Sequence, residues 1–252
     1  MSKIMTPDEL STHCAEAIDE LKKLFADFPG ADSDQMTKRT MLLAYWVKTY
    51  VKYMKAEDKF APESNFKLKR GSIVLVEFGY RIGKELGGRH YAVVLDVDNS
   101  PHRNTVTVVP LGSIKKTSAR DKYSVVLKDG IFGPIQKKVD ALIADAHRTI
   151  DEVEAMDAEI ERAASEQKAI LRAVQRQKLD TALNLIDQGE EWLNEVVHMK
   201  HGSVAKVDQI TTISKMRISQ PLKKTHPLYG VRLSANDLDK IDSRLKELYF
   251  SK

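Results

Sequence analysis

The sequence has little of several features that would assign a protein class at once. It holds a single cysteine, Cys14, among 252 residues, so no disulfide can form within the chain, and a catalytic thiol would need a basic partner. The N-terminal residues lack the continuous apolar segment of a secretory signal. No apolar run approaches the ~20 residues that a membrane helix requires. We therefore expect a cytoplasmic protein without disulfides and without membrane association.

Charge of one sign is also scarce. The net charge is +4 and the pI is about 8.9, which does not by itself indicate nucleic-acid binding. Apolar residues make up 42% and charged residues 30% of the chain, a balance typical of a globular protein. Any nucleic-acid surface must therefore come from local basic clusters.

Glycine is sparse except in one loop. The chain has 12 glycines, and Gly79, Gly83, Gly87 and Gly88 all lie in the segment 79–88. The same segment and the two residues after it carry charged or titratable side chains: Arg81, Lys84, Glu85, Arg89 and His90. Neither a core nor a plain turn needs this mixture, so the loop is the first candidate for function. Glu85 either pairs with Arg89 or is an ordinary exposed glutamate.

Runs rich in β-branched residues lie on both sides of this loop. They predict strands at Ile73–Phe78, Tyr91–Val97 and Thr105–Leu111. Further along, strands are expected at Ser124–Leu127 and Ser203–Ile213, with short extended pieces at 215–220 and 231–233. Because closing a sheet removes its exposed edges, these short strands favour a small closed barrel. A helix capped by Ser234 completes the chain.

Two helices are predicted before the strands. The first begins at Thr6-Pro7-Asp8-Glu9, a capping box with proline at the first helical position, and stops near Phe28. The second begins near Ser33 or Asp34 and ends before Pro62. Aromatic residues between Met41 and Tyr53 alternate there with lysines, a pattern that fits stacking on RNA bases. Packing of an apolar face with solvated lysines is the more common reading of the same pattern.

The segment Val139–His198 differs in kind, because it has no proline and apolar residues recur every three or four positions. A helical hairpin or coiled coil is expected, since the chain must return to the next strand. The turn falls either at Ser165–Gln167 or at Asp187–Gly189. Arg172, Arg176 and Lys178 suit a phosphate backbone or, more simply, a solvated face.

The expected fold is therefore α+β, and three segments organise it. Residues 1–66 form an N-terminal helical segment, residues 67–138 and 201–252 form the barrel domain, and residues 139–200 form an inserted helical hairpin.

Two blocks of sequence resemble the MazF/PemK-like ribonuclease toxins of bacterial type II toxin–antitoxin pairs. The first block comprises Arg70–Val74, Gly83–Leu95 and Thr105–Ser113, and the second is Gly202–Ile213. They are similar to the family's RGD-type start, its paired-glycine loop, its T-V-x-V strand and its later S-x-[VA]-x-x-[ED]-Q segment. The order and spacing of the blocks make the resemblance stronger than any single motif.

The resemblance implies an SH3-like barrel, a homodimer, a protein antitoxin as partner, and cleavage of single-stranded RNA by its own 2′-hydroxyl without a metal or cofactor. The family's catalytic positions fall on Arg89 or His90 and on Ser113, with Gly112 as the shifted alternative. RNA binding is expected at Arg81, Lys84, Glu85, Lys115 and Lys116.

One departure from the family stands at the expected catalytic position. The family has Arg followed by Pro after the paired glycines and a spacer, whereas this chain has Arg89 as the spacer, His90 in the Arg position, and then Tyr91. Either Arg89 has moved by one residue, or His90 has taken the role, or the site is altered. The alternative function is a catalytically silent barrel that binds RNA or a protein.

Overall fold

The computed structural model describes residues 5–27, 34–64, 67–114, 121–127, 130–197 and 202–250. Contacts between Cα atoms divide the chain into two compact units. One unit consists of Met1–Phe60 with Gly79–Gly88, and the other of Ala61–Phe78 with Arg89–Lys252. The glycine-rich loop thus belongs to the same unit as the N-terminal helices.

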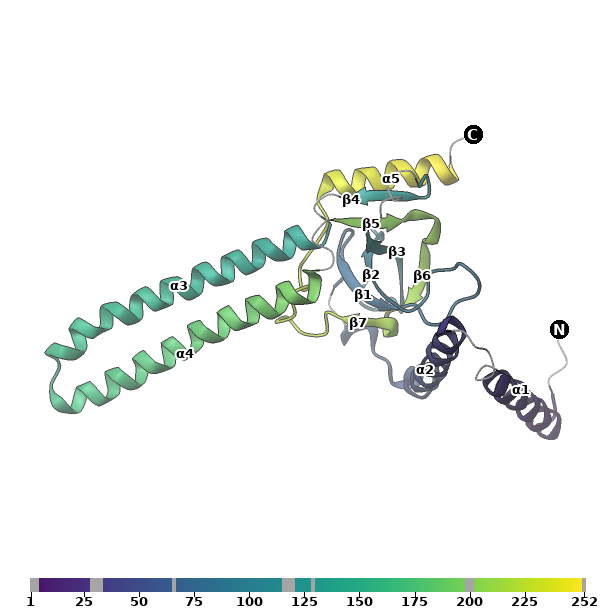
Figure 1. Cartoon of the computed structure of the whole chain (residues 1–252), viewed down its shortest axis with the longest axis horizontal. Helices are drawn as coiled ribbons and strands as arrows, with labels where there is room; N and C mark the ends of the chain where they lie inside the picture. Colours follow the sequence, from purple (N-terminus) through teal and green to yellow (C-terminus); the bar gives the residue numbers. More distant parts are fainter. Residues whose placement is uncertain are drawn as a thin grey trace. The chain divides into compact units, whose positions relative to one another are not determined.

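The helical unit contains α1 (Pro7–Asp27) and α2 (Asp34–Ala56) (Figure 1). The predicted capping box is present at the start of α1. The Thr6 amide donates to Glu9 Oε2 at 2.8 Å, and the Glu9 amide donates to Thr6 Oγ1 at 3.3 Å. These two bonds satisfy donors that a helix N-terminus leaves without partners.

The larger unit is built on one antiparallel sheet with the order β4-β5-β3-β2-β1-β7, in which β6 also pairs with β3 (Figure 1). Its strands are β1 (Ile73–Glu77), β2 (Arg89–Val94), β3 (Thr105–Ser113), β4 (Ser124–Leu127), β5 (Ser203–Lys206), β6 (Thr211–Ser214) and β7 (Ile218–Gln220). The mixed helix and sheet architecture confirms the predicted α+β class. The short 3-10 helix η6 (Val207–Gln209) divides the single strand expected at Ser203–Ile213 into β5 and β6.

The central strands are buried on both faces. On one face Tyr91 and Leu111 belong to the hydrophobic core that also takes in Ile241 of α5. On the other face Ala92 and Val108 are fully buried as well. Burial on both faces explains why these strands read as continuous apolar runs rather than as alternating patterns.

The sheet is open, in contrast to the closed barrel expected from the sequence. Within the described residues, β4 pairs with β5 alone and β7 pairs with β1 alone. The β7 strand has three residues and is followed by Pro221, which has no amide to donate to a neighbouring strand. The β7 strand is therefore too short to form a further ladder that would close the sheet between β7 and β4.

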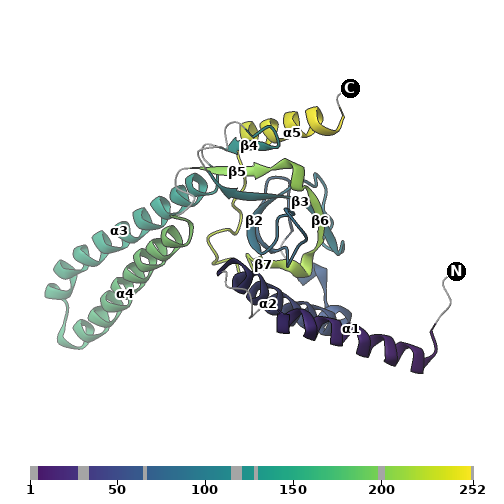
Figure 2. The ribbon, with the colours of Figure 1, turned by 45° about the vertical axis from the view of Figure 1, so that its right-hand side comes forward.

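The inserted segment forms two antiparallel helices, α3 (Phe132–Arg162) and α4 (Ser165–Val196), which lie side by side along their length (Figure 2). The hairpin turns at residues 163–164, directly before Ser165, and Asp187–Gly189 lies inside α4. The α3 helix begins seven residues before Val139, because Pro134 is tolerated in a first helical turn.

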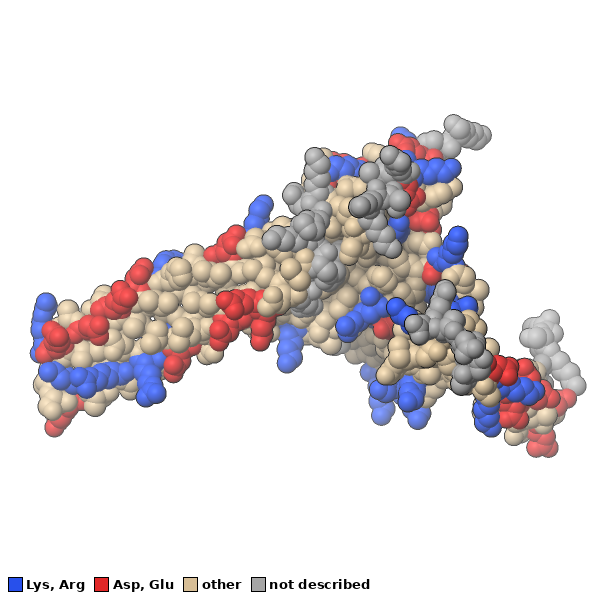
Figure 3. Space-filling model, viewed as in Figure 1, with Lys and Arg blue, Asp and Glu red and all other residues tan. Residues whose placement is uncertain are grey.

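Cross-helix polar contacts support the α3–α4 packing. The Gln175 side chain donates to the Val153 carbonyl at 3.0 Å, and Lys178 pairs with Glu152 at 2.7 Å. The hydrogen bond and the charge of Lys178 lower the pKa of Glu152. Figure 3 shows Lys and Arg gathered along the outer part of α4, whereas Asp and Glu gather along α3.

The last helix, α5 (Ala235–Tyr249), begins as predicted. Ser234 Oγ accepts a hydrogen bond from the Asp237 amide at 3.1 Å. In the piece expected to be extended at residues 231–233, Arg232 forms a single bridge with Ser72 rather than part of a strand. No helix in the described ranges is long and apolar enough to cross a membrane.

Asp121 anchors the start of β4 and makes stability depend on pH. Its carboxylate accepts hydrogen bonds from Ser124 Oγ at 2.5 Å, Lys206 Nζ at 3.0 Å and the Tyr123 amide at 3.0 Å. These hydrogen bonds lower the pKa of Asp121 from 3.8 to about 2, and the bond from Ser124 has the largest effect. A lowered carboxyl pKa gives stability that is present above the unfolded value and is lost as the pH falls through the folded value.

Asp121→Asn is therefore expected to lower the melting temperature at pH 7, and the difference from the unsubstituted protein is expected to vanish by about pH 2. Thermal unfolding followed by circular dichroism between pH 2 and pH 7 measures both effects. Asp145→Asn is the matched control, because Asp145 forms a surface pair with Arg148 only and such pairs contribute little. An Asp121→Asn difference that persists unchanged at pH 2 would contradict this assignment.

Candidate functional site

The glycine-rich loop has a backbone that only glycine adopts easily. Gly79, Gly83 and Gly88 have φ angles of 79°, 62° and 80°, in the region that side chains disfavour. The Gly88 amide donates to the Gly79 carbonyl at 2.7 Å and closes the loop on itself. A Cβ on Gly87 would stand 2.6 Å from that same carbonyl oxygen. The sequence thus encodes a defined loop shape.

The charged residues of this loop are partly paired with each other. Arg81 forms an ion pair with Glu85, with 3.6 Å between Nη1 and Oε2. Two alternatives were open for Glu85, a pair with Arg89 and an ordinary exposed position; Glu85 pairs instead with Arg81, four residues before it. Lys84 is exposed. A partly exposed pair of this kind contributes little to stability, so its main effect is to hold Arg81 beside Glu85.

The α2 helix packs against the start of the loop. A Cβ on Gly79 would lie 2.5 Å from the Trp46 indole, so Trp46 occupies the space that any other residue would need. The Arg39 Nε donates to the Tyr80 hydroxyl at 3.4 Å. The second helix therefore positions the loop, a role that the sequence pattern of aromatic residues alone did not reveal.

Arg89 and His90 are the first residues of β2. In the β1–β2 ladder Arg89 lies opposite Glu77, and His90 lies opposite Val76. Arg89 is exposed, and His90 is half-buried. Because successive side chains of a strand point to opposite faces, Arg89 shares the face of Tyr91 and His90 the opposite one.

Ser113 is the last residue of β3, where it is exposed and lies opposite Ser203 of β5. Antiparallel pairing of β2 with β3 sets Ala92 opposite Pro110. The β2–β3 ladder ends at this pair, and from Leu111 on β3 pairs with β5 instead. Arg89 lies three residues before the last β2 pair, and Ser113 lies three residues beyond the last β3 pair. Arg89 and Ser113 are thus at the ends of neighbouring strands, outside the paired part of the β2–β3 ladder.

Glu77 is a residue of this site that the sequence did not single out. It is half-buried at the end of β1 and faces Arg89 across the ladder. Opposite charges at such cross-strand positions attract and orient each other. Its position opposite Arg89 depends on the register of β1 with β2. Residues 78–88 connect these two strands without a recognisable tight turn, so the sequence does not indicate that register. Lys115 and Lys116 lie outside the described residues.

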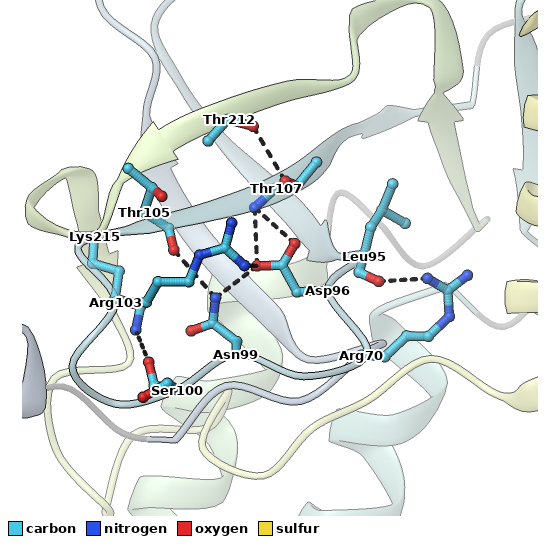
Figure 4. A network of polar contacts seen from close by, with 10 residues as sticks. All are labelled: Arg70, Leu95, Asp96, Asn99, Ser100, Arg103, Thr105, Thr107, Thr212 and Lys215. Atoms are coloured by element: carbon cyan, nitrogen blue, oxygen red, sulfur yellow. Dashed lines mark hydrogen bonds and ion pairs between the residues drawn. The ribbon is translucent and has the colours of Figure 1, made fainter.

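A buried polar network lies at the other end of β2 and β3 (Figure 4). Asp96 accepts hydrogen bonds from the Asn99 side chain at 2.6 Å and from the Thr107 amide at 3.3 Å. Lys215 is 2% exposed, and its Nζ donates to the Ser100 carbonyl at 2.9 Å. Burial, more than the nearby charge of Arg103, lowers the pKa of Lys215. These contacts fix the β2–β3 connection and lie a strand's length from Arg89.

Within the described ranges, no three His, Cys, Asp or Glu side chains gather in a way that would hold a metal ion. Two grooves are present, one between β4 and α5 and one beside Trp192 of α4. Neither is lined by Arg89, His90 or Ser113. The candidate site consists instead of an exposed arginine, an exposed serine and a carboxylate on neighbouring strand ends.

The comparisons with known proteins bear on residues 69–186. This range matches the family described as PemK-like, MazF-like toxin of type II toxin-antitoxin system, which confirms the resemblance noted from the sequence. The match covers β1 to β4, α3 and most of α4, whereas the second block, Gly202–Ile213, lies beyond it. A search of curated proteins returns no significant match.

Proposed function

Because residues 69–186 belong to the PemK-like, MazF-like toxin family, we propose that the protein is an endoribonuclease that cuts single-stranded RNA. One observation carries the proposal: Arg89, at the start of β2, lies opposite Glu77 in the β1–β2 ladder, and Ser113 ends the strand that pairs with β2 on its other side. An arginine, a hydroxyl and a carboxylate supply a positive charge, a hydrogen-bond donor and a proton acceptor.

The proposed reaction is attack by the RNA 2′-hydroxyl on the adjacent phosphorus. A bond forms between O2′ and phosphorus, and the bond between phosphorus and O5′ breaks. O2′ gives up its proton to an acceptor on the protein, and O5′ takes up a proton from water as it leaves. The products are a 2′,3′-cyclic phosphate and a 5′-hydroxyl. Negative charge accumulates on the equatorial oxygens in the transition state, so fixed donors directed at those oxygens lower the barrier.

Arg89 is proposed to stabilise that charge. Its planar guanidinium donates two parallel hydrogen bonds to phosphate oxygens and does not lose its proton. Ser113 donates one more hydrogen bond to a non-bridging oxygen. Both side chains are exposed, as contact with a macromolecular substrate requires.

Two groups compete for the proton of the 2′-hydroxyl. Glu77 lies opposite Arg89 in the ladder, and a carboxylate is an acceptor at neutral pH. A histidine can also accept a proton, but His90 is half-buried and the strand pleat directs it to the face opposite Arg89. We assign the proton acceptor to Glu77, and His90 to a supporting position.

The protein is also proposed to act with partners of its own. The family consists of toxins of type II toxin–antitoxin systems, so we propose a protein antitoxin as the partner that inhibits cleavage, and a homodimer as the active form. The second candidate function is a silent RNA- or protein-binding barrel. It is favoured by one observation, the half-buried His90 at the position that the family fills with arginine.

Induced expression in bacterial cells separates the two functions. The endoribonuclease is expected to arrest growth and to fragment cellular RNA, and Arg89→Ala at equal protein levels is expected to leave growth unchanged. Growth that continues with the unsubstituted protein, or equal arrest by Arg89→Ala, would contradict catalysis and favour the binding module.

A further inference from the structure

One face of α2 carries lysines that have no partner among the described residues. Lys38, Lys48, Lys52 and Lys55 are all exposed, and Tyr45 lies among them. At about 100° per residue these five side chains fall within roughly 100° of the helix circumference. We call this face the lysine stripe. It lies about a third of a turn from Trp46, which packs against Gly79.

The charge of this helix is unusual for the chain. Of the residues in α2, five are basic and only Asp34 is acidic. None of the four lysines has an ion pair or side-chain hydrogen bond with another described residue. By contrast, Lys22 and Lys23 of α1 pair with Asp19 and Glu20 at 2.9 and 2.8 Å. Like charges on one helix face repel each other, so the stripe lowers helix stability with no compensating ion pair among the described residues.

One aromatic side chain accompanies these lysines. Tyr45 is 64% exposed, so its ring is not used to fill a core. A positively charged surface with exposed aromatic rings suits single-stranded nucleic acid, because lysines neutralise phosphates and rings stack on bases. An acidic protein partner would pair with the lysines but would not need the exposed Tyr45 ring among them.

The stripe lies on the helix that packs against the glycine-rich loop. Trp46 and Arg39 of the same helix contact Gly79 and Tyr80, within one compact unit. The loop ends at Gly88, one residue before Arg89. RNA bound along α2 would therefore be held by the helix that packs against this loop.

We propose that the lysine stripe of α2 is a binding surface for single-stranded RNA. This rests on the proposed function, because it concerns the same substrate. The stripe binds phosphates and stacks one base on Tyr45. It therefore raises affinity without taking part in the bond-breaking step.

Binding is tested on the full chain with a 5′-fluorescein-labelled, mixed-sequence 30-nucleotide RNA whose 2′-hydroxyls are all methylated. This probe cannot be cut by attack of O2′, so fluorescence anisotropy measures affinity alone. Lys48→Gln with Lys52→Gln is expected to weaken binding about tenfold. The slope of log affinity against log salt concentration is expected to fall by about 1.4, since each lost phosphate contact removes about 0.7.

The ring of Tyr45 is tested separately. Tyr45→Ala is expected to weaken binding about tenfold through lost stacking, whereas Tyr45→Phe, which keeps the ring, restores binding to within about twofold of the original. All these side chains are exposed, and unchanged circular dichroism spectra verify that the variants fold.

The matched control is Arg172→Gln with Arg176→Gln, which removes two exposed charges from α4. It is expected to leave affinity within about twofold. Unchanged binding by the α2 variants, or an equal loss from the α4 control, would overturn the proposal. A further outcome is that the α2 variants lose affinity as expected but the unsubstituted protein does not cut unmethylated RNA. The endoribonuclease function is then wrong, whereas the RNA-binding surface is supported.

Discussion

Arg89→Ala is expected to reduce RNA cleavage about a thousandfold, whereas His90→Ala is expected to reduce it by less than about tenfold. The reason is the β1–β2 ladder, which sets the exposed Arg89 opposite Glu77, whereas His90 is half-buried and the strand pleat directs it to the other face. Loss of a charged donor at a reacting phosphate typically costs 10²- to 10³-fold or more. The measurement is kcat/KM on a fluorogenic single-stranded RNA.

Arg89→Lys is the conservative control for this prediction. Lysine retains the positive charge but lacks the planar fork that binds two phosphate oxygens, so an intermediate rate is expected. The alternative assignment, in which His90 fills the family's arginine position, predicts the reverse order of the two alanine variants. A larger loss from His90→Ala than from Arg89→Ala would show that assignment to be right.

Gly79→Ala is expected to displace the glycine-rich loop from α2 and to lower RNA cleavage strongly. The new methyl group would stand 2.5 Å from the Trp46 ring, far inside van der Waals contact. In addition, alanine at a φ of 79° is strained by roughly 1 kcal/mol or more. Limited proteolysis, followed by mass spectrometry of the products, is expected to show new cuts within residues 79–88.

Gly83→Ala separates the steric effect from the backbone effect. Gly83 also has a positive φ, 62°, but nothing lies within 4 Å of the Cβ position. Its substitution therefore carries the backbone strain alone, and a smaller loss of activity is expected. Equal effects of the two substitutions would mean that the Trp46 contact does not position the loop.

Local sequence signals predicted the helix ends and most of the strands. The capping box at Thr6 and the cap at Ser234 were predicted because each depends on residues three positions apart. The hairpin turn was harder to place. Ala163 and Ala164 form it with φ angles of −72° and −65°, which any residue adopts, so no glycine or proline marks the turn.

The site was less predictable than the fold, because it depends on strand register. The sequence pattern started the second strand at Tyr91, which left Arg89 and His90 in a loop with no defined faces. In the structure β2 begins at Arg89, and alternation then separates the two residues. Glu77 could not be found from the sequence, since its position opposite Arg89 depends on a ladder that closes around a long loop.

The central claim is that this chain cuts single-stranded RNA through attack of its own 2′-hydroxyl. Its most direct test is to map the ends produced when the purified protein acts on a mixed-sequence single-stranded RNA with excess chelator present. The claim predicts fragments that carry a 2′,3′-cyclic phosphate and a 5′-hydroxyl, with Arg89→Ala leaving the RNA whole. Intact RNA, or fragments with a 3′-hydroxyl and a 5′-phosphate, would contradict it.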